Sequence, residues 1–242
     1  FGEALGGLLS TTHQNVSLSL ELAPSVGFSR AFTAYEVEGP SVAAEGSREV
    51  RIPLGDLFAE ERRDILVALT LPEAAVVGPQ GLGLLRARGF SVRAKLTETV
   101  DPVPLAVERR SDVDVWGPSH PQVERHWNRH VATEALEAGR MAAQAGDLAG
   151  ARRRLAAACE VLSASPLTQQ GDSISVGLLA DLNECIADLR HEETYRSFGS
   201  KKMACMKGAH TKQRACFGQD FSAGYSNSTM QAMGKAFDKH CK

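Results

Sequence analysis

The chain has 242 residues, and its hydrophobic content of 43% is enough for a packed core, which excludes disorder as a description of the whole. The formal net charge of −2 gives no reason to expect nucleic acid or an anionic membrane as a partner. No apolar run approaches the roughly 18 residues that a membrane-spanning helix needs. The five cysteines are scattered and odd in number, which favours a reducing, cytoplasmic compartment; organellar and secreted locations are the alternatives.

The first ten residues, Phe1 to Ser10, have the pattern of a helix end that runs directly into a strand. This leaves no room for the start of a domain. We therefore expect residue 1 to lie inside a longer protein, so that any motif of a preceding domain is outside this sequence.

Residues 15–115 show the two-residue periodicity of strands with one buried and one solvated face. Similar runs are separated by turns that contain Gly, Pro, Ser and charged residues. The expected strands cover residues 16–22, 32–37, 49–54, 64–71, 89–97 and 104–109. Their spacing predicts an antiparallel β-sandwich, with a short helical turn over residues 55–63.

At Pro121 the hydrophobic period changes to the 3.6 residues of an amphipathic helix. Gly146 and Asp147 provide a stop and a new N-cap, and Pro166 ends the second helix, so residues 121–165 are expected to form a helical hairpin. Asp172 is expected to cap a third helix that packs on the hairpin. The faces predicted to be buried contain Val123, Trp127, Val131, Ala135, Ala138 and Ala142, then Leu148, Ala151, Leu155, Ala158, Cys159 and Leu162, then Leu178, Leu182, Cys185, Ile186 and Leu189.

The last part of the chain, residues 193–242, is predicted to be an irregular basic tail with a short helix near its end. From His191 onward there are nine Lys and Arg against four Asp and Glu, whereas the preceding residues carry a net charge of −7. The tail is too apolar for a simple solvated segment and too rich in glycine to fold alone. We expect it to dock on the acidic body or on a protein partner. The expected anchors are Met203, Met206, Phe217, Phe221, Tyr225, Met230, Met233 and Phe237.

The sequence offers no constellation from which a catalytic site can be assembled. Residues 81–86 begin like a phosphate-binding loop but lack its third glycine. His126 and His130 share a helix face, yet no glutamate lies between them and the neighbouring arginines disfavour a cation. The cysteines and histidines after residue 204 have spacings that fit no compact zinc knuckle. We predict no catalytic residue, cofactor or metal in this chain, and neither nucleic acid nor a membrane as a partner.

Several stretches together resemble a known family. They are residues 6–10, 55–67 and 145–152, and the match extends into the tail at Tyr195, residues 210–214, Tyr225, Met230 and Met233. This combination resembles the region after the vWA domain in plant RING-type ubiquitin ligases of the wavy-growth group and related vWA proteins. Family members carry the RING and the vWA cation site ahead of this region, and neither lies within this sequence.

The periodicity divides the chain into a β-sandwich (15–115), a helical bundle (116–192) and an irregular C-terminal docking tail (193–242). The resemblance implies that residues 1–14 are the end of a vWA helix and its link. Three functions remain open. The chain is a non-catalytic scaffold or protein-interaction module after a vWA domain, or the substrate-binding half of a RING-type ubiquitin ligase, or an accessory subunit of a large organellar complex. In each case we expect the partner to be a protein, which includes the chain's own upstream vWA domain.

Overall fold

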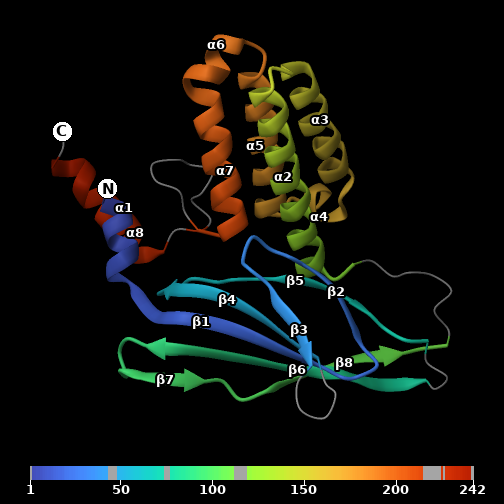
Figure 1. Cartoon of the computed structure of the whole chain (residues 1–242). Helices are drawn as coiled ribbons and strands as arrows, with labels where there is room; N and C mark the ends of the chain where they lie inside the picture. Colours follow the sequence, from blue (N-terminus) through green and yellow to red (C-terminus); the bar gives the residue numbers. More distant parts are fainter. Residues whose placement is uncertain are drawn as a thin grey trace. The chain divides into compact units, whose positions relative to one another are not determined.

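A computed structural model describes residues 2–42, 48–73, 77–111, 119–214, 225 and 227–240. It divides the chain into two compact units (Figure 1). One unit, the β unit, consists of residues 2–61, 65–118 and 229–242; the other, the helical unit, contains residues 62–64 and 119–228. The expected mixed class, with an antiparallel sheet first and helices second, is confirmed.

The β unit contains a six-stranded and a two-stranded sheet. The helix α1 (Gly2–Leu9) leads directly into β1 (Thr11–Leu22), as expected. The large sheet has the order β3-β4-β1-β6-β7, with β8 also paired to β6. Its remaining strands are β3 (Glu38–Val42), β4 (Arg48–Phe58), β6 (Gly78–Ser91), β7 (Leu96–Thr99) and β8 (Val103–Arg109). The small sheet pairs β2 (Gly27–Phe32) with β5 (Leu66–Thr70), and the described pairs are all antiparallel.

The core of the β unit lies between one face of the large sheet and the small sheet. Alternate side chains of β1 and β4 point into it, and partly buried side chains of β2 and β5, including Phe28, Val67 and Leu69, pack against them. This alternation follows from the two-residue period of a strand. The opposite face of β1, β4 and β6 is polar. The fully buried members of the core are Val16, Leu20, Leu22, Val26, Val50, Ile52 and Leu54.

Three features of the β unit differ from the sequence expectations. The strand expected at residues 32–37 lies earlier, at Gly27–Phe32, and β3 was not predicted. The run expected at 89–97 is divided between β6 and β7 by a turn. Residues 55–58 belong to β4 instead of a helical turn, because Gly55 adopts φ +75° and takes up a register shift opposite β1. Hydrophobic periodicity does not reveal such irregular pairing.

The helical unit is built from α2 (Pro121–Gln144), α3 (Leu148–Ala164), α4 (Pro166–Gln169), α5 (Ser173–Asp188), α6 (Glu192–Thr194) and α7 (Ser200–Lys212). A π-helix, Tyr195–Gly199, joins α6 to α7. The two predicted caps are confirmed: a carboxylate oxygen of Asp147 accepts from the Gly150 amide at 2.7 Å, and one of Asp172 accepts from the Ser175 amide at 3.0 Å. The long helices α2, α3, α5 and α7 stand side by side (Figure 1).

The buried stripe of α2 lies one position away from the predicted one. Trp127 is 44% exposed, whereas the polar side chain of Asn128 is 2% exposed. The Asn128 amide donates to the hydroxyls of Ser165 at 2.8 Å and Ser175 at 3.2 Å, so its burial is compensated. A pattern based on hydrophobicity misses such a residue. The predicted faces of α3 and α5 do contribute to the core, which contains Ala151, Leu155, Ala158, Leu162, Leu178, Leu182, Cys185 and Leu189.

The prediction of an irregular tail is wrong for residues 193–212, which are helical throughout. The short helix predicted near the end of the tail is confirmed as α8 (Ser228–His240). Residues 200–212 are rich in alanine, lysine and methionine, which favour helices. The one glycine inside α7, Gly208, faces open space, since a Cβ there would meet no atom within 4 Å.

In the β unit α8 lies beside α1 (Figure 1), where a Cβ on Gly6 would be 2.9 Å from the Met230 Cα. Of the described helices, none has the length and apolar character needed to cross a membrane.

Candidate functional site

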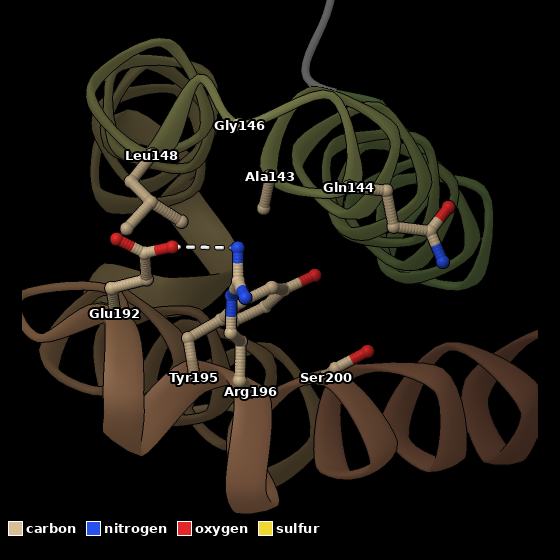
Figure 2. A pocket seen from close by; sticks show the side chains of 8 residues that line it. All are labelled: Ala143, Gln144, Gly146, Leu148, Glu192, Tyr195, Arg196 and Ser200. Atoms are coloured by element: carbon tan, nitrogen blue, oxygen red, sulfur yellow. Dashed lines mark ion pairs between the residues drawn. The ribbon is translucent and has the colours of Figure 1, made fainter.

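A pocket of about 280 Å³ opens in the helical unit between the α2–α3 turn and the segment that joins α5 to α7. Figure 2 shows its two walls: one is the end of α2 and the start of α3, and the other is α6, the π-helix and the start of α7. The residues that line it are Ala143, Gln144, Gly146, Leu148, Glu192, Tyr195, Arg196 and Ser200.

Local sequence explains the shape of the first wall. Gly146 has φ +87°, a conformation that favours glycine, and it ends α2 within two residues of the next helix. The Asp147 carboxylate then caps α3, and a Cβ on Gly150 would lie 1.8 Å from that carboxylate. The chain therefore turns tightly, and Ala143 and Leu148 stand on opposite sides of the turn, where they supply the apolar part of the pocket.

The second wall supplies the polar groups. Arg196 and Glu192 form an ion pair of 2.7 Å, and their side chains are 77% and 63% exposed (Figure 2). Tyr195 is only 4% exposed, and its buried hydroxyl has no hydrogen-bond partner among the described residues. A buried hydroxyl without a partner is costly and calls for an explanation. Tyr195 belongs to the π-helix, and π-helical turns occur frequently at functional sites.

The pocket combines an apolar floor with donors and acceptors of both charges. The guanidinium of Arg196 donates, the carboxylate of Glu192 accepts, and the hydroxyls of Tyr195 and Ser200 do both. Because the Arg196–Glu192 pair is exposed, it is weak and a ligand can replace either member. The arrangement suits recognition of a polar segment such as a peptide, whose main chain also presents donors and acceptors.

A buried polar chain lies elsewhere in the helical unit. His210 Nε2 is 2.7 Å from Asp181 Oδ2, and His210 Nδ1 is 3.1 Å from the Tyr225 hydroxyl. Tyr225 also hydrogen-bonds Arg129; burial raises the pKa of Tyr225 and lowers that of Arg129. His210 and Asp181 are 4% and 7% exposed, so this chain ties α5, α7 and α2 together in the interior.

Asp64 provides a second polar cluster in the same unit. Its carbonyl oxygen accepts from Arg129 at 3.0 Å and from Gln213 at 2.7 Å, and its carboxylate lies 3.2 Å from His126 Nε2. Burial, and after it the neighbouring positive charge of Arg129, lowers the pKa of His126 to about 4. His126 is therefore neutral in the folded protein at pH 7.

This depressed pKa predicts a pH dependence of stability. Below its ordinary pKa of about 6.5 the His126 side chain takes up a proton in the unfolded chain, whereas in the folded chain it does so only near pH 4. The free energy of unfolding should therefore fall as the pH drops through this window. His126→Gln should make that fall shallower, as measured by urea unfolding across the window.

The matched control for this experiment is His191→Gln, because His191 is exposed on the surface of the same unit. It should leave the pH dependence of the wild type unchanged. An equal change of slope in the two variants would show that burial of His126 is not responsible.

The structure separates the predicted anchors of the tail. Met203 and Met206 are 1% and 0% exposed in the helical core, and Met230 is 3% exposed beside α1. Tyr225 joins the buried chain with His210, and Met233 is half-buried on α8. Phe217 and Phe221 lie outside the described residues, and for Phe237 only its place in α8 is described.

The other residues considered from sequence are also separated. His130 stacks at a tilt on Trp127, with ring centroids 5.5 Å apart, while His126 faces Asp64. Burial raises the pKa of the Cys185 thiol to about 12, which opposes nucleophilic chemistry at pH 7. Within the described residues, no three His, Cys, Asp or Glu side chains gather in a way that would hold a metal ion.

Sequence reasoning missed the pocket and the polar chain. The pocket depends on Tyr195 and Arg196, which the expectation of an irregular tail placed outside any regular element. The contact between Asp181 and His210 joins residues 29 positions apart, and no local pattern signals it. The available signal was the pair of acidic residues before Tyr195, which favours the start of a helix there.

Three ubiquitin ligases of Arabidopsis thaliana are similar to this chain. The E3 ubiquitin-protein ligase WAVH1 is 29% identical over 191 residues, which are 78% of this chain and 27% of WAVH1. The E3 ubiquitin-protein ligase WAV3 is 29% identical over 183 residues, 73% of this chain and 23% of WAV3. The probable E3 ubiquitin-protein ligase WAVH2 is 28% identical over 163 residues, 65% of this chain and 21% of WAVH2. The chain thus spans about a quarter of the length of these relatives.

A solved structure and the family models complete the comparison. The chain superposes on a von Willebrand factor type A protein from Catenulispora acidiphila with a TM-score of 0.53 and 15% identity, over 78% of this chain and 41% of that one. This likeness concerns the fold alone. No family model matches the chain. The relatives confirm the resemblance found in the sequence: the chain is similar to one part of the ubiquitin ligases of the wavy-growth group.

Proposed function

We propose that this chain is a non-catalytic protein-interaction module of a ubiquitin ligase, that it follows a vWA domain, and that it holds the protein to be ubiquitinated. The observation that carries the proposal is the similarity of 78% of the chain to one part of a protein named as an E3 ubiquitin-protein ligase. A ligase needs one surface for the ubiquitin-charged enzyme and another for its substrate. No RING-type Cys and His spacing occurs in this sequence, so the second surface is the role that we assign to it.

The pocket beside Tyr195 supports this role. It presents an exposed guanidinium and an exposed carboxylate on one wall, opposite the apolar side chains of Ala143 and Leu148, and these groups match the main chain and side chains of a peptide. The apolar contact gives affinity, and the charges select orientation. A scaffold that only braces its neighbours, the second candidate, would not need such a pocket.

Photo-cross-linking in the natural protein that contains this chain tests the proposal. A benzophenone amino acid at Ser200, in the pocket, should capture proteins that carry ubiquitin; the same group at Val161, which is 50% exposed on α3, should not. Arg196→Glu should lower the captured amount, whereas Arg154→Glu, at an exposed position of α3, should not. If the cross-linkers at Ser200 and Val161 captured the same set of proteins, or if the captured proteins carried no ubiquitin, the scaffold that only braces its neighbours would be favoured.

The non-catalytic part of the proposal has a separate test. The purified chain, mixed with a ubiquitin-charged conjugating enzyme, should transfer ubiquitin at the background rate only. The free conjugating enzyme is the control. Transfer above that control would contradict a purely binding role.

A further inference from the structure

Three arginines gather on the polar face of the large sheet in the β unit. In the register of the sheet, Ser19 of β1 lies opposite Arg51 of β4 on one side and Arg86 of β6 on the other, and Ser17 lies opposite Arg88. Residues directly opposite each other on adjacent strands point to the same face, with Cβ atoms about 5 Å apart. The three guanidinium groups therefore surround two serines on β1.

These side chains line a hollow of about 130 Å³, together with Glu49 and Ala87. The hollow lies on a hydrogen-bonded sheet, opposite the face that carries the hydrophobic core. Pockets for drug-sized ligands usually measure about 300 Å³ or more, so this hollow suits a small group and not a nucleotide.

Two of the three guanidinium groups in the hollow form no direct ion pair with a described residue. Arg86 forms an ion pair with Glu21 at 3.3 Å, and the Glu49 carboxylate accepts from the Ser19 hydroxyl at 2.9 Å. The guanidinium groups of Arg51 and Arg88, by contrast, have no hydrogen bond or ion pair to any described residue. Each has five N–H donors in a planar fork that matches two oxygens of an anion.

We propose that this hollow binds the phosphoryl group of a phosphorylated side chain on the protein that the module holds. Arg51 and Arg88 donate to its oxygens from two sides, and the serine hydroxyls complete the shell. A phosphoryl group carries nearly two negative charges and at least three acceptor oxygens, which matches two uncommitted guanidinium groups better than a carboxylate does. This inference rests on the proposed function, since it names a feature of the captured protein.

The surroundings of the hollow favour a protein ligand over a membrane. Three carboxylates border it: Glu21, Glu49 and the exposed Glu38, which lies opposite Arg51 in the register. A membrane rich in anionic lipids would present many charges to these carboxylates and be repelled. A single phosphoryl group on a flexible segment can reach the arginines without approaching these carboxylates.

Titration of the purified chain tests the site without any ligase component. The probes are inorganic phosphate, blocked phosphoserine (the N-acetyl amide) and the same compound without phosphate, followed by the NMR signals of the Arg51 and Arg88 side chains. We expect blocked phosphoserine to shift these signals and its unphosphorylated form to leave them unchanged. Arg51→Ala and Arg88→Ala should each weaken binding about tenfold, the loss of one charge-assisted contact.

The control is Arg93→Ala, at an exposed turn of the same unit, which should leave the affinity unchanged. Equal weakening by Arg93→Ala would overturn the site, because it would show attraction to net charge only. Binding of inorganic phosphate without phosphoserine would overturn the assignment to a protein side chain. The same assignment would be overturned if the chain bound phosphatidylcholine vesicles that contain a phosphoinositide more tightly than blocked phosphoserine, and if Arg51→Ala abolished that vesicle binding.

The two proposals can fail separately. If the cross-linker in the pocket captures no ubiquitin-bearing protein while phosphoserine still binds, the proposed function is refuted. The phosphate site then remains, but its assignment to a captured protein is refuted as well. Absence of phosphoserine binding, with the cross-link intact, would refute the phosphate site alone.

Discussion

Leu155→Asp should unfold the helical unit. Leu155 is 0% exposed on α3, and Gly139 of α2 lies so close that a Cβ there would be 3.3 Å from the Leu155 side chain. The substitution removes a packed leucine, at about 2–5 kcal/mol, and places a carboxylate in an apolar core that solvent does not reach. Because whole domains are stable by only about 5–15 kcal/mol, this loss should leave little or no folded helical unit.

Hydrogen exchange and the far-ultraviolet helix signal would measure the effect. The amides of α2, α3 and α5 should lose protection, and the urea midpoint should fall sharply or vanish. Val161→Asp is the matched control, since Val161 stands on the same helix and is 50% exposed. A wild-type midpoint for Leu155→Asp would mean that the seam between α2 and α3 tolerates a charge and that its packing does not hold the unit together.

The sequence alone predicted those parts of the fold that local chemistry determines. Pro121, Asp147 and Asp172 mark helix starts because each acts within one turn of its own position, and the structure confirms all three. The leucines of α3 and α5 are apolar at helical spacing, so their burial was also predictable.

Parts of the fold that depend on distant partners were not predictable from local patterns. Asn128 is buried because Ser165 and Ser175, 37 and 47 residues away, satisfy its amide. The phosphate hollow likewise needs the register of three strands, which places Arg51 and Arg86 on either side of Ser19. In the sequence these arginines look like ordinary solvated positions of alternating strands.

The tail shows a third kind of limit. Its methionines were correctly recognised as too apolar for solvent, but composition does not say what covers them. Met203 and Met206 enter the core of the helical unit, where the Cys185 thiol lies 3.4 Å from the Met206 sulfur. Apolar side chains among lysines also fit an amphipathic helix, and the helix-forming residues of 200–212 favour that structure.

Gly83→Ala should disrupt the large sheet. Gly83 lies in β6 with φ +150°, and a Cβ at this position would be 2.0 Å from the carbonyl oxygen of Glu21 and 3.0 Å from the Cα of Leu22. Both clashes involve backbone, so no side-chain rotation relieves them and β1 must move away from β6. Leu22 is 0% exposed, and its displacement opens the core, so we expect a loss of about 3 kcal/mol or more.

Gly81→Ala is the matched control, because a Cβ at Gly81 would meet no atom within 4 Å. Only Gly83→Ala should lower the urea midpoint strongly and remove the exchange protection of the β1 and β6 amides. Arg86 and Arg88 lie on the same strand, three and five residues beyond Gly83, so a shift of β6 against β1 should also separate them from Ser17 and Ser19. Phosphoserine binding should therefore weaken in Gly83→Ala and persist in Gly81→Ala. Retained binding in a folded Gly83→Ala protein would mean that the arginines do not need the register of the sheet to meet the phosphoryl group.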